Sequence, residues 1–162
     1  MKIRKTAEIL EISHDEIVDL LSTALYGSSY LSAEYDKEFY NSLPKDKKHG
    51  DCYEDHMADV LLNGGEIYLY DNDSDGEIYN NRSNAEVIDE GNCQYTQYTI
   101  TLVDLIDGLQ KAASGTYKTN GNDVEYLAEC FRDFENDCGG GFDLCEADAL
   151  MQIVMFDELI YG

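Results

Sequence analysis

The sharpest local pattern of potential metal ligands lies in residues 71–78, which read DNDSDGEI. Asp71, Asp73 and Asp75 stand at positions 1, 3 and 5, with a glycine at position 6 and an aliphatic residue at position 8, as in a calcium loop. Position 12 of such a loop requires a bidentate glutamate, but Arg82 occupies it here. A turn rich in Asp, Asn and Gly explains the same residues. We therefore predict a turn and keep calcium binding by loop 71–76 as the alternative.

Sulfur and imidazole groups form no catalytic or zinc-binding pattern. The cysteines are five in number and irregularly spaced, which favours free thiols over a disulfide framework; they are Cys52, Cys93, Cys130, Cys138 and Cys145. The histidines (His14, His49 and His56) do not complete a Cys/His cluster at ligand spacing. Cys52 and His56 lie one helical turn apart, but no third group orients the base. We predict no metal, no cofactor, no catalytic residue and no enzyme activity.

The charge of the chain is strongly unbalanced. Its 162 residues include 34 Asp and Glu against 11 Lys and Arg, a formal net charge of −23. This balance argues against direct nucleic-acid binding, which needs cations to neutralise phosphates, and against an anionic membrane surface. Residues 1–48 hold nine acids and seven bases, whereas residues 49–162 hold 25 acids and four bases. The acidity belongs to the second part, and the expected partner is a basic protein.

A helix predicted near residues 123–134 concentrates these acids. Glu125, Glu129 and Asp133 recur every four residues and so line one side of it, although like charges at this spacing disfavour a helix by about 0.2–0.5 kcal/mol per pair. A purely solubilising surface usually mixes both signs, whereas residues 121–162 hold eleven acids and one base. We predict a DNA-mimicking surface that occupies the basic nucleic-acid-binding site of a partner protein. The predicted contact residues are Glu125, Glu129, Asp133, Glu135, Asp137, Asp71, Asp73 and Asp75. An accessory protein with a solubilising surface is the alternative.

Periodicity and capping residues predict the elements that carry these groups. Ser13 and Glu16 form a capping box for a helix that ends near Gly27, and a second helix spans residues 53–62. Thr101 and Asp143 cap two later helices. Alternating residues predict strands near 66–70, 77–79 and 95–100, with the first two joined as a hairpin by turn 71–76. We expect one α+β domain over residues 1–162, a small antiparallel sheet packed by about five helices. Its near-neutral part is residues 1–48 and its strongly acidic part is residues 49–162.

The N-terminal segment is not predicted to direct export. Glu8, Glu11, Asp15 and Glu16 interrupt any apolar core that a signal peptide would need. No stretch approaches the roughly 18 apolar residues of a membrane helix. We therefore expect a cytoplasmic protein.

Two segments and the general composition resemble a known group of proteins. Residues 19–27 (DLLSTALYG) and 148–162 (DALMQIVMFDELIYG), with the size, acidity and absence of Trp, are similar to small acidic proteins encoded by phages and mobile elements of bacteria. Several such proteins are antirestriction or anti-CRISPR inhibitors, and some mimic DNA. The resemblance implies an anti-defence inhibitor in the host bacterial cytoplasm. A Cas9-type RNA-guided nuclease is the expected target, because its positively charged nucleic-acid channel suits an acidic decoy.

Overall fold

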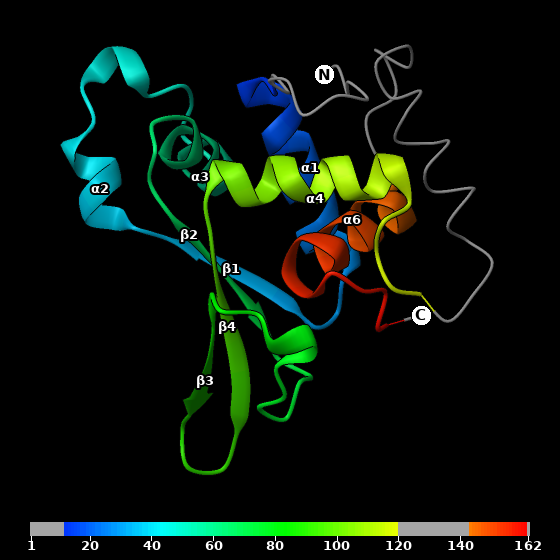
Figure 1. Cartoon of the computed structure of the whole chain (residues 1–162). Coiled ribbons are helices and arrows are strands. Elements are labelled where there is room, and N and C mark those ends of the chain that lie inside the picture. The colour runs from blue at the N-terminus through cyan, green and yellow to red at the C-terminus, as the bar shows by residue number, and fades with distance from the viewer. Residues whose placement is uncertain (1–11, 120–142, 162) are drawn as a thin grey trace.

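The computed structural model describes residues 12–119 and 143–161, which form a sheet with helices packed on it (Figure 1). The four strands are antiparallel in the order β1-β2-β4-β3; they are β1 Leu31–Tyr35, β2 Ile67–Asp71, β3 Ala85–Asp89 and β4 Gln94–Ile100. The α-helices within the described ranges are α1 His14–Gly27, α2 Lys37–Ser42, α3 Tyr53–Leu62, α4 Leu102–Ser114 and α6 Leu144–Phe156. None of these helices has the length and apolarity that crossing a membrane requires. The predicted α+β class is confirmed.

The helices begin at the capping residues that the sequence predicts. The Ser13 hydroxyl accepts a hydrogen bond from the Glu16 amide, and the Glu16 carboxylate accepts one from the Ser13 amide, both at 3.2 Å. Thr101 begins α4 with a similar capping box, and the Asp143 side chain accepts from the Glu146 amide at the start of α6. Each cap satisfies amides that have no partner within the helix. Helix α3 has the predicted bounds.

The strand predicted at residues 77–79 is wrong. This segment leaves the sheet, and Tyr79–Asn81 forms a short 3₁₀ helix, η2. Asn80, with φ 56°, donates its side-chain amide to the Phe156 carbonyl at 2.7 Å. Arg82 Nη2 donates to the Val154 carbonyl at 3.1 Å. The segment therefore caps the carboxyl end of α6, while the next segment, β3, pairs with β4.

Three elements in residues 28–50 have no counterpart among the predictions. They are β1, α2 and the 3₁₀ helix η1, Lys45–Lys47. Strand β1 lies at an edge of the sheet, and of its five residues only Leu31 is fully buried. An edge strand with so few buried side chains has a weak hydrophobic pattern, which explains why its sequence does not reveal it.

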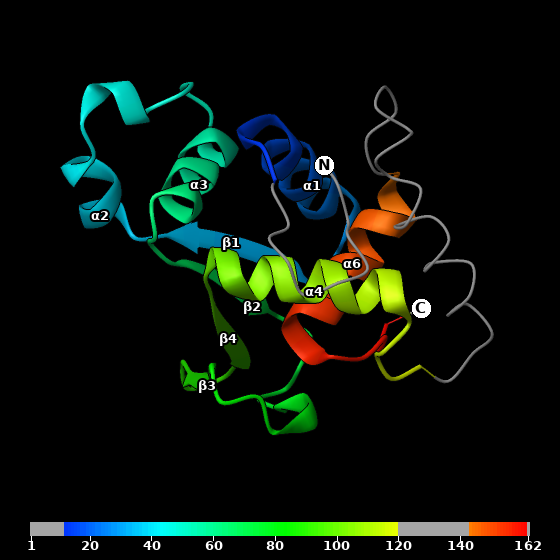
Figure 2. The same cartoon turned by 45° about the horizontal axis from the view of Figure 1, so that its top comes forward.

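The apolar core lies on one face of the sheet. Strands β2 and β4 turn Ile67, Leu69, Tyr98 and Ile100 toward the helices, and all four are fully buried. Helix α6 packs against both α1 and α4 (Figure 2), and nine of its thirteen residues are buried. A helix that is apolar nearly all round belongs at the centre of a core, so α6 is the helix on which α1 and α4 pack.

The residues after α6 fold back onto it through the buried side chain of Gln152. Gln152 Oε1 accepts hydrogen bonds from the amides of Ile160 at 2.7 Å and Tyr161 at 2.9 Å. Its Nε2 donates to the Asp148 carboxylate at 2.8 Å and to the Tyr161 carbonyl at 3.1 Å. Asp148 also accepts from the Ser28 hydroxyl at 2.5 Å. All the polar atoms of this amide are therefore paired, which offsets the cost of burying it.

Helices α4 and α6 approach most closely at Gly108. A Cβ built on Gly108 would lie 3.1 Å from Val154 Cα and would overlap the Val154 side chain. Glycine inside a helix costs roughly 0.5–1 kcal/mol relative to alanine. The close approach of α6 explains why glycine stands here despite that cost.

Replacing Gly108 tests this packing. Gly108→Ala should lower the free energy of unfolding by about 1–3 kcal/mol, because the added methyl group overpacks the α4–α6 contact. Urea denaturation followed by circular dichroism measures the change. Val103→Ala, on the exposed side of the same helix, is the control and should stay within about 0.5 kcal/mol of wild type. A Gly108→Ala variant as stable as wild type would contradict the close packing.

Candidate functional site

Asp71, one of the predicted contact residues, is buried. Tyr161 Oη donates to both of its carboxylate oxygens at 2.9 Å, and the Asp73 amide donates to it at 3.1 Å. Burial raises the pKa of the Asp71 carboxyl because desolvation disfavours its charged form, and the hydrogen bond from Tyr161 opposes this rise. Asp71 is a structural residue of the core, which corrects its prediction as a surface contact.

Asp73 and Asp75 are exposed on the turn that follows β2, as surface contacts require. Ser74 lies buried between them, and its hydroxyl accepts hydrogen bonds from Thr96 Oγ1 at 2.9 Å and from the Gly76 amide at 3.1 Å. The segment is thus held as a turn by its own backbone and by β4. In the part of the chain that the structure describes, its carboxylates do not gather into a group that could hold a metal ion.

The other five predicted contact residues lie outside the described residues. They are Glu125, Glu129, Asp133, Glu135 and Asp137. The helix predicted near 123–134 lies in the same segment, so both the helix and its role in binding stay predictions.

The described cations of residues 49–162 are engaged within the fold. Asp157, the C-cap of α6, accepts from Arg82 Nη1 at 2.7 Å and from Lys111 Nζ at 2.6 Å. Burial by itself would lower the pKa of Lys111, but the hydrogen bonds of Lys111 to Asp157 and Asp107 raise this pKa overall. Lys118 Nζ donates to Asn80 Oδ1 at 2.6 Å. These cations therefore serve internal contacts rather than a separate basic surface.

The face of the sheet opposite the apolar core is not covered by the described helices, and the β3–β4 hairpin extends away from them (Figure 1). Side chains alternate between the two faces of a strand, so the pairing register identifies which residues share this face. We call it the open sheet face, and its residues are Ser32, Glu34, Tyr68, Tyr70, Glu86, Ile88, Tyr95, Gln97 and Thr99. Strands β1 and β3 are the edges, so Glu34 and Glu86 flank a centre of three tyrosines.

Tyrosine hydroxyls orient carboxylates around this face. Tyr70 Oη donates to Glu34 Oε2 at 3.1 Å, Tyr95 Oη donates to Glu90 Oε1 at 2.8 Å, and the two tyrosine rings meet edge-on. Burial, followed by the charge of Glu34, raises the pKa of Tyr70. The hydrogen bond to Glu90 raises the pKa of Tyr95. Both phenols are therefore neutral donors at physiological pH. A shallow depression here is lined by Ser32, Ala33, Glu34, Tyr70, Asn72 and Tyr95.

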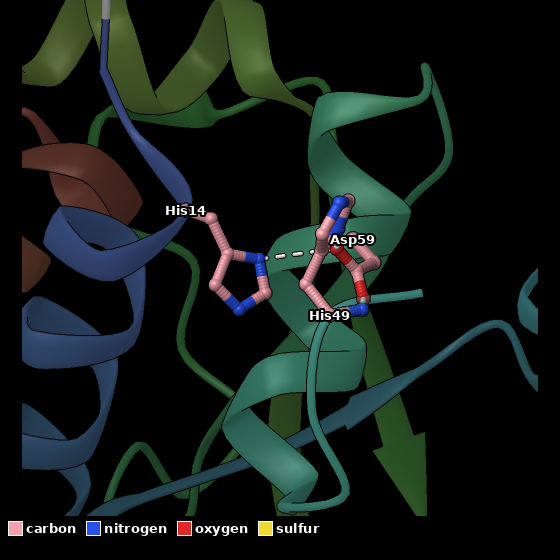
Figure 3. A group of neighbouring side chains, drawn as sticks. All are labelled: His14, His49 and Asp59. Atoms are coloured by element: carbon pink, nitrogen blue, oxygen red, sulfur yellow. Dashed lines mark hydrogen bonds and ion pairs between the residues drawn. The ribbon is translucent and has the colours of Figure 1, made fainter. Parts of the chain in front are cut away.

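A second group of functional side chains lies between α1 and α3. His14 at the start of α1, His49 in the loop before α3, and Asp59 within α3 converge (Figure 3). Nδ1 of His14 lies 3.1 Å, and Nδ1 of His49 2.9 Å, from the same oxygen, Asp59 Oδ1. The other oxygen of Asp59 accepts the His49 amide at 2.7 Å. The Asp59 side chain is only 1% exposed and that of His49 is 56% exposed, so the cluster reaches the surface at His49.

Asp55 and Gly50 support this cluster. Asp55 Oδ1 lies 2.9 Å from His14 Nε2, and this hydrogen bond lowers the pKa of the Asp55 carboxyl. Gly50 has φ 119°, and a Cβ there would overlap the Asp55 carboxylate, so glycine suits the position after His49. No local spacing in the sequence predicts the cluster, because its members come from three separate segments.

The pair Cys52 and His56 shows no catalytic arrangement. His56 Nδ1 is hydrogen-bonded to Tyr35 Oη at 2.8 Å, and its ring stacks on Tyr40 with a centroid distance of 4.0 Å. The imidazole is therefore part of an aromatic cluster. Among the cysteines that the structure describes, Cys52, Cys93 and Cys145 are exposed free thiols, as predicted.

The raised pKa of Asp71 predicts how stability changes with pH. Between the unfolded-state value, about 3.9, and the higher folded value, the folded protein binds more protons than the unfolded chain, so stability falls as pH rises through this window. Asp71→Asn keeps an acceptor for Tyr161 without the charge. We expect the unfolding free energy of wild type, relative to Asp71→Asn, to decrease as the pH rises above about 4 in urea titrations. The exposed Asp73→Asn is the control and should show no such trend. A relative stability that is flat or rises would contradict control by desolvation.

Comparison with known proteins does not assign this chain to a family. No protein-family model matches the sequence. No curated protein and no solved structure shows significant similarity to it either. The function must therefore be argued from the open sheet face and from the cluster between α1 and α3.

Proposed function

We propose that this protein is a non-enzymatic inhibitor that binds the basic nucleic-acid-binding site of a bacterial defence nuclease. The observation that supports this most directly is the composition of the sheet, since its four strands contain the exposed carboxylates Glu34, Glu86 and Asp89 but no Lys or Arg. Glu34 and Glu86 stand on the open sheet face. Negative charges that are fixed on a rigid sheet attract a cationic partner and repel an acidic one.

The arrangement of the open sheet face suits a protein partner. Protein interfaces combine an aromatic centre with a polar rim, and here Tyr68, Tyr70 and Tyr95 lie between Glu34 and Glu86. Neighbouring strands are about 4.8 Å apart, so the two edge glutamates are separated by about 14 Å across the sheet. Tyrosine contributes a large contact area together with a polar hydroxyl. The complementary surface would place arginines or lysines around a small apolar patch.

Competition with nucleic acid is the proposed mode of inhibition. A DNA duplex presents about one negative charge per 1.7 Å of its axis, and a surface of fixed carboxylates can occupy the same cationic channel without carrying a base sequence. Five acids outside the described residues stay predicted contacts of the same partner: Glu125, Glu129, Asp133, Glu135 and Asp137. The proposed target is a Cas9-type RNA-guided nuclease in the bacterial cytoplasm, because such enzymes hold their nucleic acids in a positively charged channel. The resemblance to acidic phage proteins supports this choice.

Charge reversal on the open sheet face tests the proposal. Glu34→Lys combined with Glu86→Lys should weaken binding to a purified, guide-loaded Cas9-type nuclease at least about tenfold, because like charges then face each other. Inhibition of DNA cleavage should weaken in parallel. The control combines Glu38→Lys with Asp46→Lys, two exposed residues outside the strands, and changes the net charge equally. Its affinity should stay within about threefold of wild type, since distant charges are screened at physiological salt.

Salt provides an independent measurement. The Debye length shortens from about 8 Å at physiological ionic strength to about 3 Å at 1 M, so binding should weaken steeply over this range. Equal losses in both double variants would contradict a role for the open sheet face. A wild-type protein that neither binds the nuclease nor captures a basic nucleic-acid-binding protein from bacterial extract would contradict the proposed function, and would favour a solubilising surface.

A further inference from the structure

The cluster of His14, His49 and Asp59 plays no part in the proposed binding function. It joins α1, the loop before α3, and α3 (Figure 3), whereas the open sheet face belongs to the strands. Two imidazole rings from separate segments direct Nδ1 toward one oxygen of a buried carboxylate. Such convergence costs conformational entropy and buries a charge, and within the chain the hydrogen bonds of Asp59 to the His49 amide and to His49 Nδ1 oppose this cost.

The hydrogen bonds around His14 leave a place for a cation. The Asp55 carboxylate accepts a hydrogen bond from His14 Nε2 at 2.9 Å. A neutral imidazole that donates from Nε2 has a lone pair on Nδ1, and this nitrogen lies 3.1 Å from Asp59 Oδ1. His14 Nδ1 is buried and makes no hydrogen bond. Two acceptors at this distance repel each other unless a proton or a metal ion lies between them.

The spacing and chemistry of the three donor atoms match a zinc ion. Ligands that bind zinc at 2.0–2.1 Å in a tetrahedron lie about 3.3 Å apart, close to the observed 3.1 Å and 2.9 Å between the imidazole nitrogens and Asp59 Oδ1. All three ligand atoms lie within 4.8 Å of one another. Two imidazoles and one carboxylate suit zinc, whereas magnesium and calcium prefer oxygen ligands throughout.

We propose that His14 Nδ1, His49 Nδ1 and Asp59 Oδ1 bind one zinc ion. A fourth position, on the side where His49 reaches the surface, is open to water, as in zinc sites with three protein ligands. Asp55 holds the His14 ring through Nε2, the usual role of a second carboxylate behind a zinc-bound histidine. The His49 amide holds Asp59 Oδ2 in the same way. Zinc would then link α1 to α3 and to the loop between α2 and α3.

Zinc titration of the full chain tests this site. After treatment with a chelator, the wild-type protein should bind one zinc ion per chain in calorimetry with ZnCl₂, and its melting temperature should rise. His49→Gln removes a ligand from an exposed loop position, so the fold should persist without zinc, and the zinc affinity should fall at least about 100-fold. Asp55→Asn should weaken zinc binding by about 10–100-fold, as loss of a supporting carboxylate does.

Matched controls separate this site from other zinc-binding groups. His56→Gln removes a histidine of α3 whose ring contacts Tyr35 and Tyr40, and Cys52→Ser removes a nearby exposed thiol. Both variants should bind zinc as wild type does. The proposal is overturned if wild type binds no zinc, if His49→Gln binds it as tightly as wild type, or if Cys52→Ser abolishes binding. Because the readout is metal binding, these outcomes are independent of nuclease inhibition.

Discussion

The hydrogen bonds of Gln152 are the constraint on which the rest of the core depends. They hold the backbone of Tyr161 against α6, and this places the Tyr161 side chain between two other parts of the fold. Its hydroxyl donates to Asp71 at the end of β2, and its ring packs on Tyr30 just before β1, with centroids 4.4 Å apart. Tyr30 Oη in turn donates to Asp148 in α6 at 3.0 Å. One buried amide thereby links the central helix to both strands β1 and β2. Leaving any of these buried polar groups unpaired would cost about 1–3 kcal/mol, so the network specifies one arrangement of helix and sheet.

The fold also separates the charges of an extremely acidic chain. Arg82 and Lys111 converge on Asp157 at the end of α6, where they hold the loop after β2 and helix α4 to the C-terminal segment. Most of the described acids are instead exposed or half-exposed, and on the sheet they stand at the edges. The four strands therefore carry carboxylates without Lys or Arg, and the field of the sheet is negative. The aromatic centre of the open sheet face would lose much of its value as a contact if lysines stood beside it.

The elements that can be predicted from the sequence are those whose cause is local. Three helices begin where the sequence predicts, because the side chains of Ser13, Thr101 and Asp143 pair with amides three residues further along the chain. Short alternating stretches predict β2 and β4. Segments whose structure depends on distant residues are not predicted correctly. The segment after Gly76 resembles a returning strand, yet its asparagine and arginine cap α6. Asp71 stands at the first ligand position of a calcium loop, but its carboxylate accepts a hydrogen bond from Tyr161, which lies 90 residues further along the chain. The three residues of the His14 cluster come together only after α1 and α3 have packed. Asp73 and Asp75, on the turn that follows β2, are exposed, and their contact with a partner stays a prediction.

The position of α6 has a consequence for how the chain acquires its structure. This helix fills the space between α1 and α4, yet it follows both of them in the sequence. During synthesis the earlier elements emerge from the ribosome without the surface on which they pack, so β2 and α1 leave apolar side chains in water until residues 144–161 arrive. Contacts between segments so distant in sequence form slowly, because a long loop must close before they do. Mutual repulsion among chains of high negative charge would keep nascent molecules apart during that interval. The acidity of the chain therefore also disfavours association of molecules whose core is still incomplete.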